Sequence, residues 1–103
     1  MKRIALTTGR GWFDPDAAEQ FNESTTHDGR NRISDATGDQ FRHQTLFRTA
    51  RGRWVLENFS QWQGDRNTYE EISAEEAALW LVKCHHEPPS RGKVAEAVAA
   101  LEV

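Results

Sequence analysis

Four consecutive residues near the C-terminus have side chains that commonly bind metal ions: Cys84, His85, His86 and Glu87. His27 and His43 are the remaining histidines and the more distant candidate ligands. Zinc requires four ligands that converge at about 2.0 to 2.3 Å. Adjacent residues on a helix point about 100° apart, so their side chains do not converge on one ion. The sequence therefore predicts no metal site and no cofactor.

Residues for covalent or acid–base catalysis are equally poorly placed. Cys84 falls on the apolar stripe of an expected helix, whereas a nucleophilic cysteine needs an accessible, polarised thiol. The carboxylate pairs Glu70-Glu71 and Glu75-Glu76 are sequence neighbours, so each pair is divided between two faces or serves a helix cap. No phosphate-binding loop, hydrolase, metalloprotease or dinucleotide-binding motif is present. We expect no catalytic residues and no enzymatic activity.

Arginine is the dominant basic residue, with ten of the 13 basic side chains. Residues 40–66 contain five arginines and two acidic residues, although the whole chain has a net charge of −3. These arginines are Arg42, Arg48, Arg51, Arg53 and Arg66. Together with Phe59 they have the side-chain types that bind phosphates and stack on bases. The overall charge, and the absence of an RNP, KH or helix-turn-helix signature, argue against this interpretation.

The 103-residue length fits one domain, 1–103, with one small core. Hydrophobic residues make up 37% and aromatic residues 10%, which is typical of a folded chain rather than a disordered one. The apolar triplet that begins at Ile4 is too short for a signal peptide, and no later segment resembles a membrane span. A single cysteine forms no internal disulfide. We expect a cytoplasmic protein.

Short strands and turns are expected before residue 40. KRIALTT is typical of a strand, and Asp14 followed by Pro15 predicts a short capped helical turn. Asp28-Gly29 suits the two-residue loop of an irregular polar hairpin.

The central hairpin is the strongest β signal. The runs QFRHQTLFRT and RWVLENFSQW flank ARG, and alternation in the second run places Trp54, Leu56 and Trp62 on one face. A loop with an even number of residues pairs Phe47 with Leu56 and leaves one face polar. A three-residue loop, with Gly52 left-handed in a G1 bulge, shifts the register by one residue and puts apolar groups on both faces. We prefer the even loop because it separates core from surface.

In that register a strip of long polar side chains surrounds an aromatic residue on the outward face. Its members are Arg42, Gln44, Arg48, Phe59 and Gln61. Such a mixture is enriched in protein interfaces, so the strip is the expected binding surface, although solvated sheet faces also carry such residues.

Two helices are expected after the strand TYEEI. Ser73 and Glu76 form a capping box that starts a helix from Ala74 to about His86, and Trp80 lies on its apolar stripe. Ser90 is expected to cap a second, shorter helix. Strands followed by helices indicate an α+β fold, with an antiparallel meander of four to five strands covered on one face by the capped helix. Trp54 and Trp80 are expected to be buried.

The segment from GRWVLENFSQWQG through TYEEISAEEAALWL resembles a group of small uncharacterised bacterial proteins, some of them plasmid-borne. The shared features are a tryptophan-bearing strand, the SQWQG turn, a tyrosine strand and a capped AxxWL helix. The resemblance covers about half of the chain and implies no activity.

The leading hypothesis is therefore a small non-catalytic protein that binds a protein partner, or a second copy of itself, through the outward sheet face. Nucleic-acid binding through the arginine-rich hairpin is the alternative, and an enzyme is third. No membrane association is expected.

Overall fold

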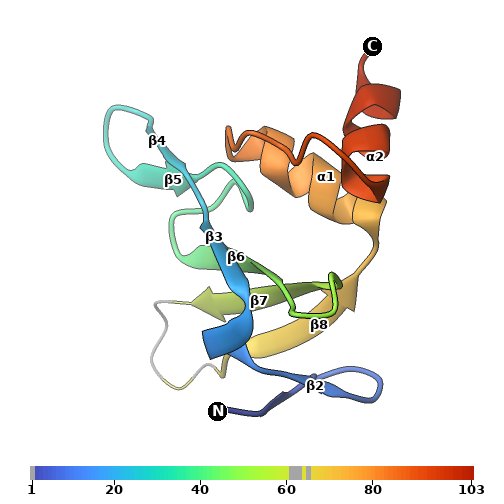
Figure 1. The fold of residues 1–103 in the computed structure, drawn as a ribbon. Coiled ribbons are helices and arrows are strands. Elements are labelled where there is room, and N and C mark those ends of the chain that lie inside the picture. Colours follow the sequence, from blue (N-terminus) through green and yellow to red (C-terminus); the bar gives the residue numbers. More distant parts are fainter. Residues whose placement is uncertain (1, 61–63, 65) are drawn as a thin grey trace.

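A four-stranded antiparallel sheet forms the centre of the fold, with two helices above one face and a small hairpin below the other (Figure 1). The computed structural model describes residues 2–60, 64 and 66–103. The strands of the sheet, in spatial order, are β3 (Glu19–Asn22), β6 (Arg42–Arg48), β7 (Trp54–Ser60) and β8 (Thr68–Ile72). The predicted α+β class is confirmed.

The hairpin of β6 and β7 has the register of the three-residue loop, the alternative to the preferred even loop. Leu46 lies opposite Leu56, and Phe47 lies opposite Val55, so the preferred even-loop pairing is wrong by one residue. The Thr49 N–H donates to the carbonyl of Arg53, and the Gly52 N–H donates to the carbonyl of Thr49, both at 2.8 Å. Gly52 has a φ of 79°, so the turn is the three-residue loop with a left-handed glycine.

This register is stable because both faces of the sheet are covered. The helical face has Leu46, Trp54 and Leu56 in its core, packed against α1. The opposite face has Phe47 and Val55, which pack against the N-terminal hairpin. The prediction of a single apolar face was wrong because it did not include the N-terminal hairpin, which covers the second face of the sheet.

The N-terminal hairpin consists of β1 (Ile4–Ala5) and β2 (Trp12–Phe13), followed by the single helical turn η1 (Pro15–Ala17). Phe13 is 4% exposed, and its ring lies 5.2 Å from that of Phe47. The Asp14 side chain accepts a hydrogen bond from the Asp16 N–H at the start of η1, which confirms the predicted cap.

The helical layer contains α1 (Ala74–Lys83) and α2 (Lys93–Leu101). The Ser73 hydroxyl accepts a hydrogen bond from the Glu76 N–H at 3.1 Å, as the capping box predicts. Trp80 and Trp54 are 5% and 6% exposed, so the prediction that both are buried is confirmed. Trp62, expected beside them, lies outside the described residues. The cap of α2 is Gly92 rather than the expected Ser90.

Helix α1 ends before the expected position near His86. Cys84 is its C-cap, and His85 has a left-handed φ of 60°. The His86 N–H donates to the carbonyl of Leu81 and the His85 N–H to that of Val82, which is the Schellman pattern of a helix C-terminus. The chain therefore leaves the helix before Pro88-Pro89, and these prolines are not what stops it.

Strands β4 (Thr25–His27) and β5 (Arg32–Ser34) form a polar hairpin that extends away from the sheet between β3 and β6 (Figure 1). Their loop covers residues 28–31, so it is longer than the expected Asp28-Gly29 pair. The Asp28 carboxylate accepts hydrogen bonds from the N–H groups of Arg30 and Asn31 and fixes this loop.

The helices formed by the described residues are too short or too polar to cross a membrane.

Candidate functional site

A cavity of about 480 Å³, here named the hairpin cavity, lies between the N-terminal hairpin and the turn that joins β6 to β7. Leu6, Phe13 and Val55 supply apolar lining. Trp12, at 55% exposed, lines the same cavity. The charged residues around it are Arg10, Asp14, Arg51, Arg53 and Glu71. Its volume falls within the range of about 300 to 1,000 Å³ that small-molecule sites usually have.

A second cavity of about 350 Å³, the helix cavity, lies on the helical side of the same turn. It is lined by the beginnings of α1 and α2, by the loop before α2 and by residues of the turn. Its charged residues are Arg48, Arg53, Glu71, Arg91 and Lys93. Arg53 and Glu71 belong to both cavities, so the two cavities adjoin across the turn.

Positive charge is concentrated at this turn. Among the described residues, six cationic side chains and two carboxylates line the two cavities. Arg53 Nε lies 2.6 Å from Glu71 Oε2, so this arginine is paired. The other five cations have no described carboxylate within 4.0 Å. A chain with a net charge of −3 therefore carries a local excess of cations here, most of them without an ion-pair partner among the residues that the structure describes.

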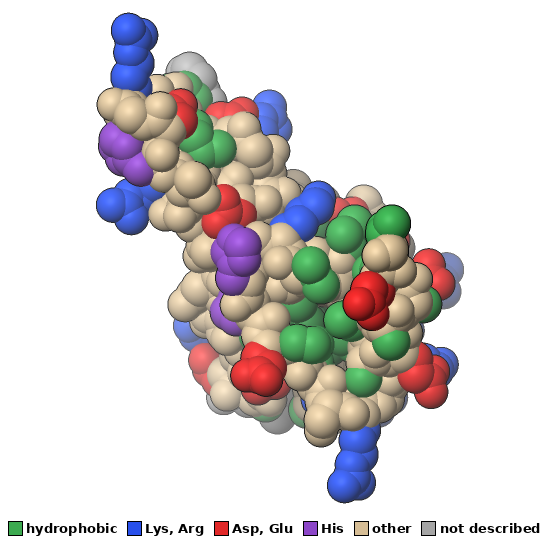
Figure 2. Space-filling model, turned by 90° about the horizontal axis from the view of Figure 1, so that it is seen from above, with side chains coloured by type: hydrophobic (Ala, Val, Ile, Leu, Met, Phe, Trp, Pro, Cys, Tyr) green, Lys and Arg blue, Asp and Glu red, His purple; other side chains and the backbone are tan. Residues whose placement is uncertain are grey.

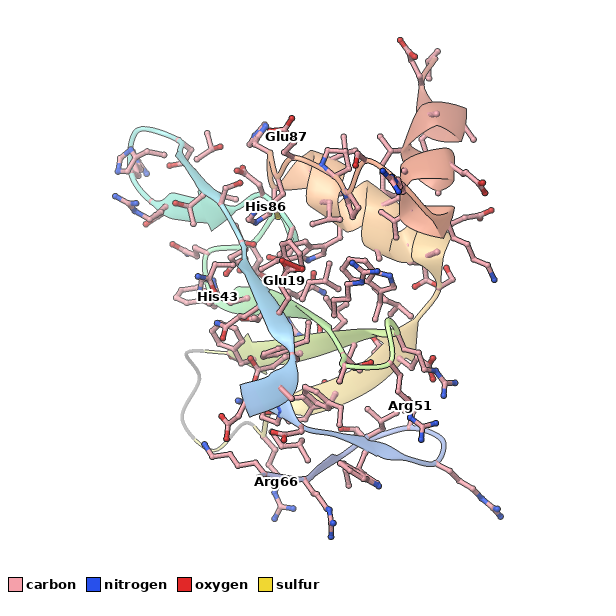
Figure 3. The ribbon with its side chains drawn as sticks, in the orientation of Figure 1. Glu19, His43, Arg51, Arg66, His86 and Glu87 are labelled. Carbon is pink, nitrogen blue, oxygen red and sulfur yellow. The ribbon has the colours of Figure 1, made fainter. Side chains whose placement is uncertain are left out.

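The fold explains why these cations are close together. The β6–β7 hairpin carries Arg48 and Arg51 at its closed end, and Figure 3 shows Arg51 extending from the turn towards the N-terminal hairpin. The N-terminal hairpin brings Arg10 to one flank of the turn, and the start of α2 brings Lys93 to the other. Arg66 lines neither cavity, and Figure 3 shows it away from Arg51.

The predicted outward strip does not form one surface. Gln44 accepts a hydrogen bond from Trp80 Nε1 at 3.0 Å, so Gln44 lies on the helical side with Arg42 and Arg48, which alternate with it along β6. The ring of Phe59 instead stacks on His43 at 5.5 Å, on the opposite face. Gln61 lies outside the described residues. The expectation of a continuous strip is wrong because it depended on the even-loop register.

Sequence reasoning identified Arg48, Arg51 and Arg53 as a basic segment but missed the residues that join them. Arg10 and Trp12 come from the N-terminal hairpin, and Arg91 and Lys93 come from the C-terminal part of the chain. The excess of arginine over lysine was the one available signal. It did not show which arginines share a surface.

A buried polar network lies beneath the β4–β5 hairpin. Ser34, at 0% exposed, donates a hydrogen bond to Glu23, and His43 Nδ1 lies 2.6 Å from the other carboxylate oxygen of Glu23. The carboxylate therefore separates the hydroxyl from the imidazole, whereas a serine nucleophile requires its histidine within hydrogen-bond reach. Ser34 is also closed to solvent. This network attaches the polar hairpin to the sheet.

Two titratable groups near this network have altered pKa values. Hydrogen bonds from the Ser24 and Thr26 hydroxyls, at 2.5 and 2.7 Å, lower the pKa of Asp35. Burial raises the pKa of the Cys84 thiol, which is 3% exposed. A raised pKa keeps this thiol protonated, the opposite of what activates a nucleophilic cysteine.

The histidines take separate structural positions. His86 Nε2 lies 2.6 Å from the Asn22 carbonyl, and its ring stacks on Trp80 at 5.9 Å. Its neighbour His85 points to solvent with 77% of its side chain exposed. Within residues 2–60, 64 and 66–103, no group of three or more His, Cys, Asp or Glu side chains is arranged to hold a metal ion.

Comparisons with protein-family models, with curated protein sequences and with solved structures give no match to this chain.

Proposed function

We propose that the chain is a non-catalytic binding protein that contacts the phosphate backbone of a nucleic acid with the basic turn. The basic turn comprises the six cationic residues that line the two cavities: Arg10, Arg48, Arg51, Arg53, Arg91 and Lys93. The observation that carries this proposal is the convergence of these side chains, five of them unpaired with any described carboxylate, around one turn of an acidic chain.

Phosphate recognition accounts for this arrangement better than solubility does. Arginine binds phosphate oxygens through two parallel hydrogen bonds, and five of the six cations are arginines. Like charges held close together repel one another, and an anionic ligand removes that repulsion. A phosphate chain also fits two adjoining concave surfaces, because its charges repeat along its length.

Fluorescence anisotropy with labelled DNA and RNA oligonucleotides of about 12 nucleotides tests the proposal, since one binding module covers about 4 to 16 nucleotides. The wild-type chain is compared with the double variant Arg91→Glu, Lys93→Glu and with the single variant Arg51→Glu. Arg66→Glu is the matched control, because it reverses an exposed arginine away from the basic turn.

We expect wild type and Arg66→Glu to bind with similar dissociation constants, and both basic-turn variants to bind at least about tenfold more weakly, as lost charged phosphate contacts imply. Equal weakening by Arg66→Glu and Arg51→Glu would indicate a general charge effect and contradict the proposal. No binding by wild type at about 50 mM salt, where electrostatic contacts are strong, would also contradict it.

A second candidate function is binding of a protein partner or a second copy through the helical layer. Leu79, Val82 and Leu101 are 44%, 47% and 43% exposed. Figure 2 shows hydrophobic side chains gathered over the helices, with acidic residues among them. This surface replaces the sheet strip as the apolar contact face. Light scattering after size exclusion tests it: Leu79→Ser with Val82→Ser is expected to abolish any self-association or partner complex that wild type forms.

A further inference from the structure

The hairpin cavity differs in chemistry from the helix cavity, although the two adjoin. Leu6, Phe13 and Val55 line the hairpin cavity, and the 55%-exposed indole of Trp12 is part of its wall. In the helix cavity the aromatic residue is Trp54, which is 6% exposed and has the Arg48 guanidinium 5.8 Å from its ring centroid. One cavity thus offers an open aromatic surface and the other offers mainly cations.

We infer that the hairpin cavity binds one unpaired base of a single-stranded nucleic acid, while the cations of the basic turn hold the neighbouring phosphates. The inference rests on the proposed function and names the form of nucleic acid that it selects. The hairpin cavity supports this inference because its lining contains an exposed indole and apolar side chains together with Arg10 and Arg51. Bases stack on exposed aromatic side chains whatever their sequence, because every base has an aromatic face.

The size and charge of the hairpin cavity are consistent with this occupant. About 480 Å³ accommodates a base and its sugar. The Arg3 guanidinium lies over one face of the Trp12 ring, 5.0 Å from its centroid, so a base stacks on the other face. A purely apolar peptide side chain would leave these arginines unused, whereas a nucleotide pairs its ring with the indole and its phosphate with a guanidinium.

The proposed site continues from the hairpin cavity into the adjoining helix cavity. Arg53 and Glu71 line both cavities, so a chain whose base enters the hairpin cavity passes its next phosphates over the turn towards Arg91 and Lys93. The bases of an intact duplex are paired and stacked inside the helix, and extracting one costs free energy that a single strand does not spend. The cavity therefore favours single strands over duplexes.

The test measures anisotropy with one labelled oligonucleotide of about 12 nucleotides, as a single strand and as a duplex with its complement. We expect Trp12→Ala to weaken single-strand binding by about five- to a hundredfold, the range of a base–aromatic stack, and to change duplex binding by less than about twofold. Trp12→Phe, which retains an aromatic ring, is expected to restore most of the loss. Phe41→Ala is the control for loss of an exposed aromatic side chain that lines neither cavity.

Tryptophan fluorescence gives a second readout. The difference between wild type and Trp12→Phe isolates the emission of Trp12, and this emission is expected to be quenched by the single strand and not by the duplex. Binding of both forms with equal affinity, with no effect of Trp12→Ala, would overturn the inference and leave the proposed function standing. No binding of either form by wild type would overturn both.

Discussion

Replacement of Trp80 tests the central packing of the fold. Its indole is 5% exposed, and it belongs to the core cluster that contains Leu46, Leu56 and Trp54. Its Nε1–H also donates a hydrogen bond to Gln44 Oε1, and Gln44 in turn donates to Asn58 Oδ1 at 2.8 Å. Trp80→Ala therefore creates a large cavity and leaves a partly buried amide oxygen without its donor.

We expect Trp80→Ala to lower the free energy of unfolding by about 3 to 5 kcal/mol, the usual cost of emptying a buried aromatic site. Trp80→Phe retains much of the ring and loses the N–H, so about 1 to 3 kcal/mol is expected. Trp12→Ala is the matched control at an exposed tryptophan, with a change within about 0.5 kcal/mol, as is usual for surface positions.

Urea unfolding followed by far-UV circular dichroism measures the three variants under one set of conditions. The slope of free energy against urea concentration is expected to remain at the wild-type value, because the variants retain the same fold. If Trp80→Ala costs no more than Trp12→Ala, α1 does not cover the sheet and the described core is wrong.

Three further predictions concern backbone strain and titration. Gly52→Ala is expected to lower the free energy of unfolding by about 1 to 2 kcal/mol in urea unfolding, since φ is 79° and a side chain there meets no atom within 4 Å. The pKa of Asp35 is lowered in the folded chain, so its carboxylate stabilises the fold at pH values above 3.8, the ordinary pKa of aspartate. This contribution is lost as the pH falls below 3.8. Unfolding midpoints measured against pH should therefore fall less on acidification in Asp35→Asn than in wild type. An equal fall in both proteins would contradict this. The raised pKa of Cys84 means that stability falls as the pH rises above 9.0, where the unfolded thiol ionises first. An aromatic disulfide reagent should react with the thiol at the rate of unfolding, and immediate reaction of the native chain would show that the thiol is accessible.

The elements that could be predicted from the sequence are those specified by neighbouring residues. The start of α1 follows from Ser73 and Glu76, and the turn η1 follows from Asp14 and Pro15. The hairpin register could not be derived in this way, because the choice depends on whether Phe47 has a partner on the second face. That partner is Phe13, which lies far away in the sequence.

In the candidate site, too, only the part formed by neighbouring residues could be predicted. Arg48, Arg51 and Arg53 form one visible segment of sequence, so a basic hairpin could be predicted. The N-terminal residues Arg10 and Trp12 join them through contacts of Phe13 with Phe47 and Tyr69, which no local pattern contains. The predicted strip around Phe59 failed because a shift of one residue places its members on opposite faces.

The salt dependence of single-strand binding tests the proposed phosphate contacts most directly. A plot of the logarithm of the association constant against that of salt concentration, from about 50 to 200 mM, has a slope of about −0.7 for each phosphate contact to a single strand. The double variant Arg91→Gln, Lys93→Gln is expected to reduce the magnitude of this slope by about 1.4, and Arg66→Gln is expected to leave it unchanged. Identical slopes for wild type and the double variant would contradict the proposal that these residues bind phosphate.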